Sequence, residues 1–165
     1  MQGVTLRSHD GLRDSLTHLA SPGLFYEELR REVSRARRSG EQVSLARFVL
    51  RVNPLAVVEL SPSEFDIEVL SFSHTLTRLT RAEDICSRMG NLEFVVLLRG
   101  NVAVAAQLSE RVAHTWIADL AKHAGSDYLC RVTLENSQLQ LDTDETALEF
   151  LNRLDQKART AKPPL

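Results

Sequence analysis

The sequence predicts an α+β domain in which helices pack on one mixed β-sheet. Three observations favour this fold class. Segments with helical and strand patterns follow one another as helix, strand, helix, hairpin, helix, strand, helix. Residues 42–52, QVSLARFVLRV, are apolar at both odd and even positions, as in a central strand buried on both faces. The length of 165 residues suits a single domain with an ordinary hydrophobic core.

The first long helix is predicted after the break SPG at residues 21–23, which follows a polar start and one short helical turn. It extends to about Ser39, and its last turn, RARRSG, is basic and followed by Gly40, as is typical of a helix C-terminus. Its apolar residues are Leu24, Leu29 and Val33. The central strand comes next, and Asn53-Pro54 ends it.

A second helix is predicted from Ser61, which is a suitable N-cap. Pro62 occupies the first helical position and Glu64 lies three residues after the cap, which is the capping-box pattern. Apolar residues then recur at helical spacing and predict one core-facing stripe: Phe65, Val69, Phe72, Leu76 and Leu79.

The remaining elements are a hairpin, two helices and the last strands. Residues 84–89, DICSRM, and 92–98, LEFVVLL, are predicted to be two short strands joined by a tight turn at Gly90-Asn91. A long helix is predicted from about residue 103 to 124, then a strand at 127–135 and an uncertain edge segment at 137–141. The closing helix is expected from about Asp144, with one apolar face formed by Leu148, Leu151 and Leu154.

Composition excludes several classes of function. A formal net charge of -2 with 25% charged residues gives no general attraction to nucleic acid or to an anionic membrane. No apolar run reaches the roughly 20 residues of a membrane-spanning helix, and the start lacks the apolar region of a signal peptide. We therefore expect a cytoplasmic protein with no nucleic-acid partner and no membrane insertion.

Single reactive side chains give little indication of chemistry. Cys86 and Cys130 are too few and too far apart for a disulfide framework or a zinc site, and Cys86 is predicted to be a small buried hydrophobe. His114 and His123 lie nine residues apart without a metal-binding pattern, so surface or packing roles are expected. Trp116 is expected in the core.

Three stretches together resemble the GGDEF domain, the diguanylate cyclase family of bacterial signalling. RMGNLEFVVLL is similar to the family's R-x-G-G-D/E-E-F hairpin, DSLTHLASPGLF to its D-x-L-T-x-L opening, and RLDQKARTAK to its closing helix. They occur in the family's order between Asp14 and Lys162. The resemblance implies a nucleotidyl-cyclase type of fold, with a mostly antiparallel five-stranded sheet surrounded by helices. Residues 1–13 are then a linker or N-terminal segment and residues 14–165 the domain.

The same alignment shows departures at the positions that carry the family's chemistry. Asn91 replaces the second glycine and Leu92 replaces an acidic metal ligand, while Arg51 and Asn53 stand where the family has Asp-x-Asp. The family's guanine-contacting asparagine falls at about Glu59. Leucine cannot coordinate Mg²⁺, which requires oxygen ligands, and phosphoryl transfer requires metal ions to neutralise charge. Although Glu93 and Phe94 match the family, a degenerate domain without catalytic residues or a bound metal is predicted.

The resemblance also implies a second, non-catalytic site, which in the family binds cyclic di-GMP through an R-x-x-D motif. RAED supplies Arg81 and Asp84, the following helix supplies Arg111, and the end of the first long helix supplies Arg37. A guanidinium can bind two phosphate oxygens or the O6/N7 edge of guanine, and a carboxylate can accept from guanine N–H groups. The expected partners are cyclic di-GMP and another domain or a second copy of the chain.

Other interpretations stay open at this point. Arg81 and Asp84 can be a solvated ion pair at a helix end, worth at most roughly 1 kcal/mol. Arg37 is equally explained by the helix macrodipole. Three functions compete: a catalytically inactive cyclic di-GMP receptor that favours a dimer, a pseudo-enzyme that binds other proteins or dimerises without nucleotide, and an active cyclase with unusual metal ligands.

Overall fold

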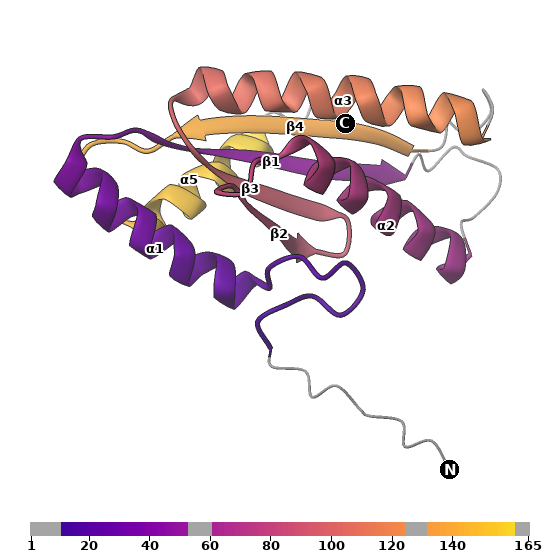
Figure 1. Cartoon of the computed structure of the whole chain (residues 1–165), viewed down its shortest axis with the longest axis horizontal. Coiled ribbons are helices and arrows are strands. Elements are labelled where there is room, and N and C mark those ends of the chain that lie inside the picture. The colour runs from indigo at the N-terminus through magenta and orange to yellow at the C-terminus, as the bar shows by residue number, and fades with distance from the viewer. Residues whose placement is uncertain (1–10, 53–60, 125–131, 161–165) are drawn as a thin grey trace, which may run out of the picture.

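The computed structural model describes residues 11–52, 61–124 and 132–160. Within these ranges the chain forms a four-stranded antiparallel sheet with the strand order β2-β3-β1-β4 and four α-helices (Figure 1). The elements are α1 (Pro22–Ser39), β1 (Val43–Val52), α2 (Pro62–Leu79), β2 (Ile85–Gly90), β3 (Glu93–Arg99), α3 (Val102–Ala124), β4 (Val132–Gln140) and α5 (Ala147–Thr160). The predicted α+β class and antiparallel sheet are confirmed.

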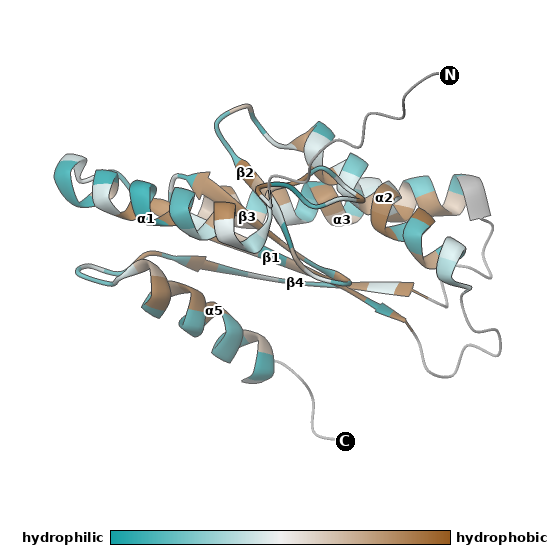
Figure 2. Cartoon of the chain, turned by 90° about the horizontal axis from the view of Figure 1, so that it is seen from below, coloured by the Kyte–Doolittle hydropathy of each residue, from teal (hydrophilic) through white to brown (hydrophobic). Residues whose placement is uncertain are grey.

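The helices cover both faces of the sheet. On one face α2 and α3 pack against β1 residues such as Ala46, Phe48 and Leu50. On the other face α1 and α5 pack against Val43 and Leu45. Figure 1 shows α3 running along β4 and β1, and Figure 2 shows that α1 and α5 have both hydrophobic and hydrophilic sides. Because successive side chains of β1 alternate between two covered faces, the strand is apolar at odd and even positions, as predicted.

An aromatic cluster forms the centre of the larger core. The ring of Phe72 on α2 lies 5.8 Å from Phe48, 4.9 Å from Phe94 and 5.9 Å from Trp116, measured between centroids. All four side chains are fully buried. Such tilted and edge-to-face contacts are favourable for aromatic pairs. The predicted core position of Trp116 is confirmed.

The predicted helix ends also agree with the structure. The Ser21 hydroxyl accepts the N–H of Leu24 at the start of α1, and Gly40 ends that helix in the left-handed region with φ of 71°. At the start of α2, the Ser61 hydroxyl accepts the N–H of Glu64, and the Glu64 carboxylate accepts the N–H of Ser61. This reciprocal pair is the capping box expected from the sequence.

The structure corrects the predicted hairpin and closing helix. Gly90 pairs with Glu93, so the two loop residues are Asn91 and Leu92 rather than Gly90-Asn91. The closing helix begins at Ala147 rather than at about Asp144. Its N-cap is Thr146, whose hydroxyl accepts the N–H of Glu149 while Oε2 of Glu149 accepts the N–H of Thr146. Leu148 is 56% exposed while Phe150 and Leu154 are buried, so the predicted apolar face is wrong at Leu148.

The last strands also differ from the prediction. The segments expected at 127–135 and 137–141 contribute to one continuous strand, β4, which pairs with β1 from Val132 to Gln140. Residues 127–131 lie outside the described ranges. The sheet therefore has four strands in the described part of the chain, compared with the five that the family resemblance implies. None of the helices described is both long and apolar enough to span a membrane.

Candidate functional site

A closed turn between α2 and β2 carries the R-x-x-D motif. The backbone N–H of Arg81 donates to Oδ2 of Asp84 at 2.8 Å, and the N–H of Asp84 donates to the carbonyl of Arg81 at 3.2 Å. The carboxylate therefore stabilises its own turn, as Asp side chains often do. The Asp84 side chain is half-buried and the Arg81 side chain is exposed.

Arg111 of α3 lies close enough to this turn for its charge to act on Asp84. Burial raises the pKa of Asp84 above its usual value, and the negative charge of Glu83 raises it further. The hydrogen bond from Arg81 and the charges of Arg81 and Arg111 oppose this rise. The fold thus brings Arg111 near Arg81 and Asp84, although Arg111 is about 30 residues from them in sequence. We call these three residues the RxxD cluster.

The two arginines of the RxxD cluster remain available to a ligand. Both side chains are exposed, and within the described ranges neither guanidinium makes an ion pair or a hydrogen bond with another residue. The alternative of a closed ion pair between the side chains of Arg81 and Asp84 does not match this geometry, because Asp84 binds the backbone of Arg81. Two exposed guanidinium groups beside a carboxylate can bind a ligand that has phosphates and guanine edges.

The fourth predicted residue of the site, Arg37, lies elsewhere. It is near the C-terminus of α1, where its Nη2 donates to the carbonyls of Asp144 at 2.9 Å and Glu145 at 3.0 Å. These bonds attach α1 to the segment before α5. The structure does not bring Arg37 to the RxxD cluster of the same chain, and a contact with ligand would require Arg37 to give up both bonds. Its ligand role stays a prediction.

Arg88 and Leu92 flank the tip of the hairpin that resembles the GGDEF signature. Arg88 donates to the carboxylate of Asp14 at 3.3 Å and to the carbonyl of Asn91 at 3.0 Å. Leu92, at the position of the family's metal ligand, packs partly buried against the larger core, and its carbonyl accepts the N–H of Leu50 at 2.9 Å. An apolar side chain directed to the core cannot ligate a metal.

Glu93, the signature carboxylate that the chain keeps, is neutralised by an arginine. Its Oε1 accepts from Nε of Arg47 at 2.7 Å, and both side chains are mostly buried. Arg47 was not predicted from the sequence, although an arginine inside a mostly apolar strand was a visible signal. The strand register sets Val49 opposite Glu93, whereas Arg51 extends past this pairing and binds Glu135 of β4 at 3.1 Å. Arg51 is thus half-exposed in a cross-strand ion pair.

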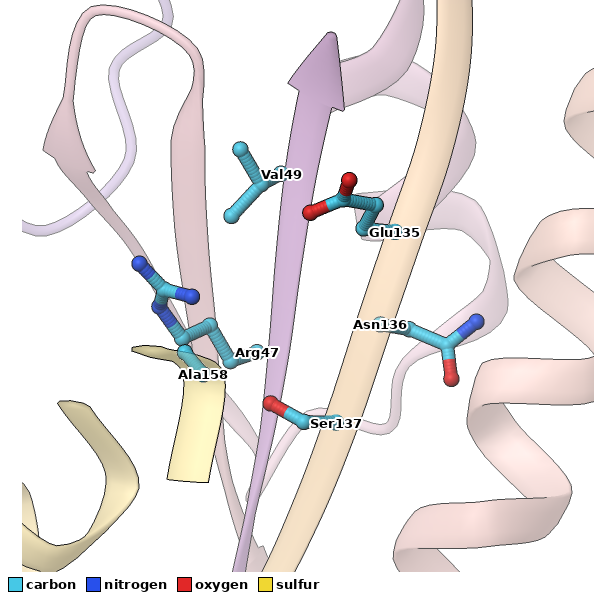
Figure 3. A pocket seen from close by; sticks show the side chains of 6 residues that line it. All are labelled: Arg47, Val49, Glu135, Asn136, Ser137 and Ala158. Atoms are coloured by element: carbon cyan, nitrogen blue, oxygen red, sulfur yellow. The ribbon is translucent and has the colours of Figure 1, made fainter. Parts of the chain in front are cut away.

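A cavity of about 250 Å³ lies beside this pair, on the face of the sheet that α5 partly covers. Figure 3 shows its lining, with side chains from β1, β4 and the end of α5. The lining residues are Arg47, Val49, Glu135, Asn136, Ser137 and Ala158. An adjoining pocket shares Arg47 and Ala158 with it and adds Glu93, Arg51, Asp155 and Arg159. The first cavity has one arginine and one carboxylate, whereas the adjoining pocket has three arginines and two carboxylates.

The residues at these pockets do not fit the magnesium ions that the family resemblance implies. Mg²⁺ requires several oxygen ligands in octahedral geometry. Strand β1 has no acidic residue from Val43 to Val52, and Glu93 is already bound to Arg47. In the described ranges no group of three or more His, Cys, Asp or Glu side chains is placed to hold a metal ion. Asn53 and Glu59, two further departures from the family, lie outside these ranges.

The isolated reactive residues have ordinary surroundings. His114 is exposed on α3. The side chain of His123 lies outside the part of the chain that the structure describes. Cys86 is mostly buried, its Sγ lies 3.4 Å from Oγ1 of Thr80, and burial raises the pKa of its thiol to about 11. Such a thiol is a poor nucleophile. Cys130 lies outside the described residues.

Comparisons with known proteins identify the fold. No protein-family model and no curated protein sequence matches the chain. Among solved structures, diguanylate cyclase SiaD from Pseudomonas aeruginosa, in complex with its activator SiaC, is 26% identical with a TM-score of 0.76; the match covers 91% of this chain and 59% of that one. The GGDEF domain of DgcB from Caulobacter crescentus, in complex with cyclic di-GMP, is 17% identical with a TM-score of 0.74, over 98% of this chain and 93% of that one.

A third solved structure, the GGDEF domain of FimX from Pseudomonas aeruginosa, is 20% identical with a TM-score of 0.73, over 91% of this chain and 93% of that one. These matches define the class: an α+β domain of the type found in diguanylate cyclases. The chain has the fold of a GGDEF domain, as the sequence motifs predicted.

Proposed function

We propose that this domain is a catalytically inactive GGDEF-type domain that binds cyclic di-GMP at the RxxD cluster and acts as a receptor for it. The observation that carries the proposal is the convergence of Arg81, Asp84 and Arg111 from two elements, with both guanidinium groups exposed. Cyclic di-GMP has two phosphates and two guanine bases. The arginines suit the phosphates and guanine O6/N7 edges, and the carboxylate suits guanine N–H donors.

The solved relatives supply an independent reason to choose this ligand. The GGDEF domain of DgcB was crystallised in complex with cyclic di-GMP. Another GGDEF domain of the same fold, 20% identical to this chain, has a described interaction mode with cyclic di-GMP. Because the ligand carries two identical halves, an intercalated pair of ligands can join two protein surfaces, so binding is expected to favour contact with a second copy or another domain.

The inactivity is argued from side-chain chemistry. Metal-assisted phosphoryl transfer needs carboxylates that hold the metal ions beside the nucleotide. Here the loop position of the metal ligand is Leu92, packed against the core, and β1 carries no carboxylate at any position. Glu93 is bound to Arg47 and would have to break that ion pair to serve a metal.

The test is calorimetric titration of cyclic di-GMP into the wild type and three single variants. We expect micromolar or tighter binding that Arg81→Ala and Arg111→Ala each weaken at least tenfold, the order expected when a hydrogen bond to a charged group is lost. Arg38→Ala is the matched control, because Arg38 is an exposed arginine at the end of α1, away from the cluster. Absence of binding by the folded wild type would overturn the proposal.

The second candidate is a nucleotide-independent interaction or dimerisation domain. It is favoured by two large apolar side chains exposed on α2, Ile67 at 60% and Leu70 at 41%. Such residues can contribute to a protein interface when they lie together. Light scattering separates the two candidates: a dimer that forms without cyclic di-GMP and is lost in Ile67→Ser favours the interaction domain.

A further inference from the structure

Arg99, at the end of β3, is held by α1. Its Nη2 donates to Oε1 of Glu32 at 2.8 Å and its Nε to Oε2 at 3.1 Å, a two-point contact. The Glu32 side chain is only 15% exposed, whereas that of Arg99 is 50% exposed. Burial opposes ionisation of Glu32, but the hydrogen bonds from Arg99 and Arg35 outweigh it and lower the pKa of Glu32 below its usual value. Glu32 therefore stays charged at neutral pH.

Arg99 also lies beside the turn that carries the RxxD cluster. The β2–β3 ladder pairs Ile85 with Leu97, so Arg99, two residues after Leu97, ends β3 next to the turn at 81–84 that leads into β2. The negative charge of Glu83 acts on both Arg99 and Asp84, so Glu83 lies near both. Arg99 approaches the turn from the face of the sheet that carries α1, whereas Arg111 approaches from the face that carries α3.

This placement has a consequence for an anionic ligand. Glu83 is exposed in the turn and repels phosphate, while Arg99 is the nearby cation that can offset it. As long as Arg99 is bound to Glu32, part of its charge is offset and two of its donors are occupied. We propose that Arg99 is a further phosphate-binding arginine of the RxxD cluster and that Glu32 of α1 competes with the ligand for it.

The inference rests on the proposed function and adds regulation to it. Glu32 lies in the C-terminal half of α1, and this helix packs against β2, β1 and α5. A displacement of α1 that separates Glu32 from Arg99 would leave the guanidinium available and raise affinity for the ligand. By linkage, a bound ligand that takes Arg99 would weaken the attachment of α1 to the sheet. The Glu32–Arg99 pair would thus couple the RxxD cluster to the position of α1.

The test is a double-mutant cycle in which calorimetry measures the affinity for cyclic di-GMP. Glu32→Gln is expected to tighten binding about two- to fivefold, the range that corresponds to an exposed ion pair. Arg99→Gln is expected to weaken binding by a similar factor. In the Arg99→Gln background, Glu32→Gln should have no effect, because its action requires the guanidinium. Glu27→Gln is the matched control, since it removes one α1 carboxylate that pairs with Arg30 instead.

The outcomes separate this inference from the proposed function. Equal tightening by Glu32→Gln with and without Arg99 would assign the effect to net charge and overturn the inference, while the receptor function would stand. No change in either single variant would also overturn it. A folded wild type that binds no cyclic di-GMP would overturn the proposed function and this inference with it. Circular dichroism of each variant establishes that the fold is kept.

Discussion

Arg88 on β2 and Asp14 in the segment before α1 form an ion pair that attaches the chain's N-terminal part to the hairpin. Nη1 of Arg88 lies 3.3 and 3.4 Å from the two carboxylate oxygens, and both side chains are mostly buried. The same carboxylate accepts from the N–H and the hydroxyl of Thr17 at 2.8 Å. Asp14 therefore stabilises its own turn and orients Arg88, which donates a hydrogen bond to the Asn91 carbonyl.

Asp14→Asn should destabilise the domain by about 1 to 3 kcal/mol at pH 7, since a charged hydrogen-bond acceptor in a half-buried site is lost. Burial alone would raise the pKa of Asp14, but the hydrogen bonds from Thr17 and the charge of Arg88 lower it below 3.8. The stabilising contribution is therefore complete above the unfolded-state pKa and is lost as the pH falls through the folded-state pKa. Urea unfolding at pH 7 and pH 3 should show a difference between wild type and variant that shrinks at low pH.

Asp155→Asn is the control for this prediction, because Asp155 is exposed and makes no hydrogen bond or ion pair with another residue in the described ranges. It should change the free energy of unfolding by less than about 0.5 kcal/mol. Equal losses in the two variants, or a gap between wild type and Asp14→Asn that does not depend on pH, would contradict the role given to Asp14.

A second prediction concerns turnover of GTP. We expect no cyclic di-GMP to form with Mg²⁺ or with Mn²⁺, because the hairpin and β1 supply no carboxylate pair for a metal. Leu92→Asp restores one carboxylate and should remain inactive, since two metal ions need more ligands than one. Chromatography of nucleotides after long incubation measures this, with an active diguanylate cyclase as the positive control. Product from the wild type would revive the view that this is a cyclase with unusual ligands.

The cap of α5 allows a third prediction. The Thr146 hydroxyl accepts the N–H of Glu149 at 3.2 Å and lies 2.8 Å from its carboxylate. Thr146→Ala should cost about 1 kcal/mol of stability, as is typical for the loss of an N-cap. Thr143→Ala, in the exposed loop just before the helix, should have little effect in the same urea titration. If both variants unfold at the wild-type midpoint, Thr146 does not hold the helix start.

The Thr146 cap also shows which features the sequence could predict. Ser61 with Glu64 and Thr146 with Glu149 have the same spacing. The start of α2 was predicted correctly from Ser61, Pro62 and Glu64, whereas the start of α5 was predicted too early, at about Asp144. Both starts depend on local hydrogen bonds. The sequence therefore held the signal for each, and the start of α5 was predicted too early because the spacing of Thr146 and Glu149 was not used.

The RxxD cluster and its surroundings show which features could not be predicted from the sequence. The motif predicted Arg81 and Asp84 as a pair of side chains, whereas the carboxylate binds backbone and the guanidinium is exposed. Family spacing carried the prediction of Arg111, whose charge acts on Asp84, but Arg47 with Glu93 and Arg99 with Glu32 were not predicted. These pairs depend on strand register and on how α1 crosses the sheet. Neither is encoded in a short stretch of sequence.

The last prediction concerns Cys86, next to the RxxD cluster. Burial raises the pKa of its thiol to about 11, the hydrogen bond with Thr80 lowers it, and the negative charge of Asp84 raises it. Relative to an ordinary thiol at 9.0, the thiolate fraction near pH 8 falls about a hundredfold. In a Cys130→Ser background, iodoacetamide should therefore react with Cys86 at least a hundredfold more slowly in the native protein than in urea.

Asp84→Asn should speed the reaction of Cys86 in the native protein modestly, because it removes the smaller cause of the raised pKa and leaves burial in place. Equal rates in the native and unfolded protein would contradict the burial of Cys86, and no change in Asp84→Asn would show that the carboxylate does not act on the thiol.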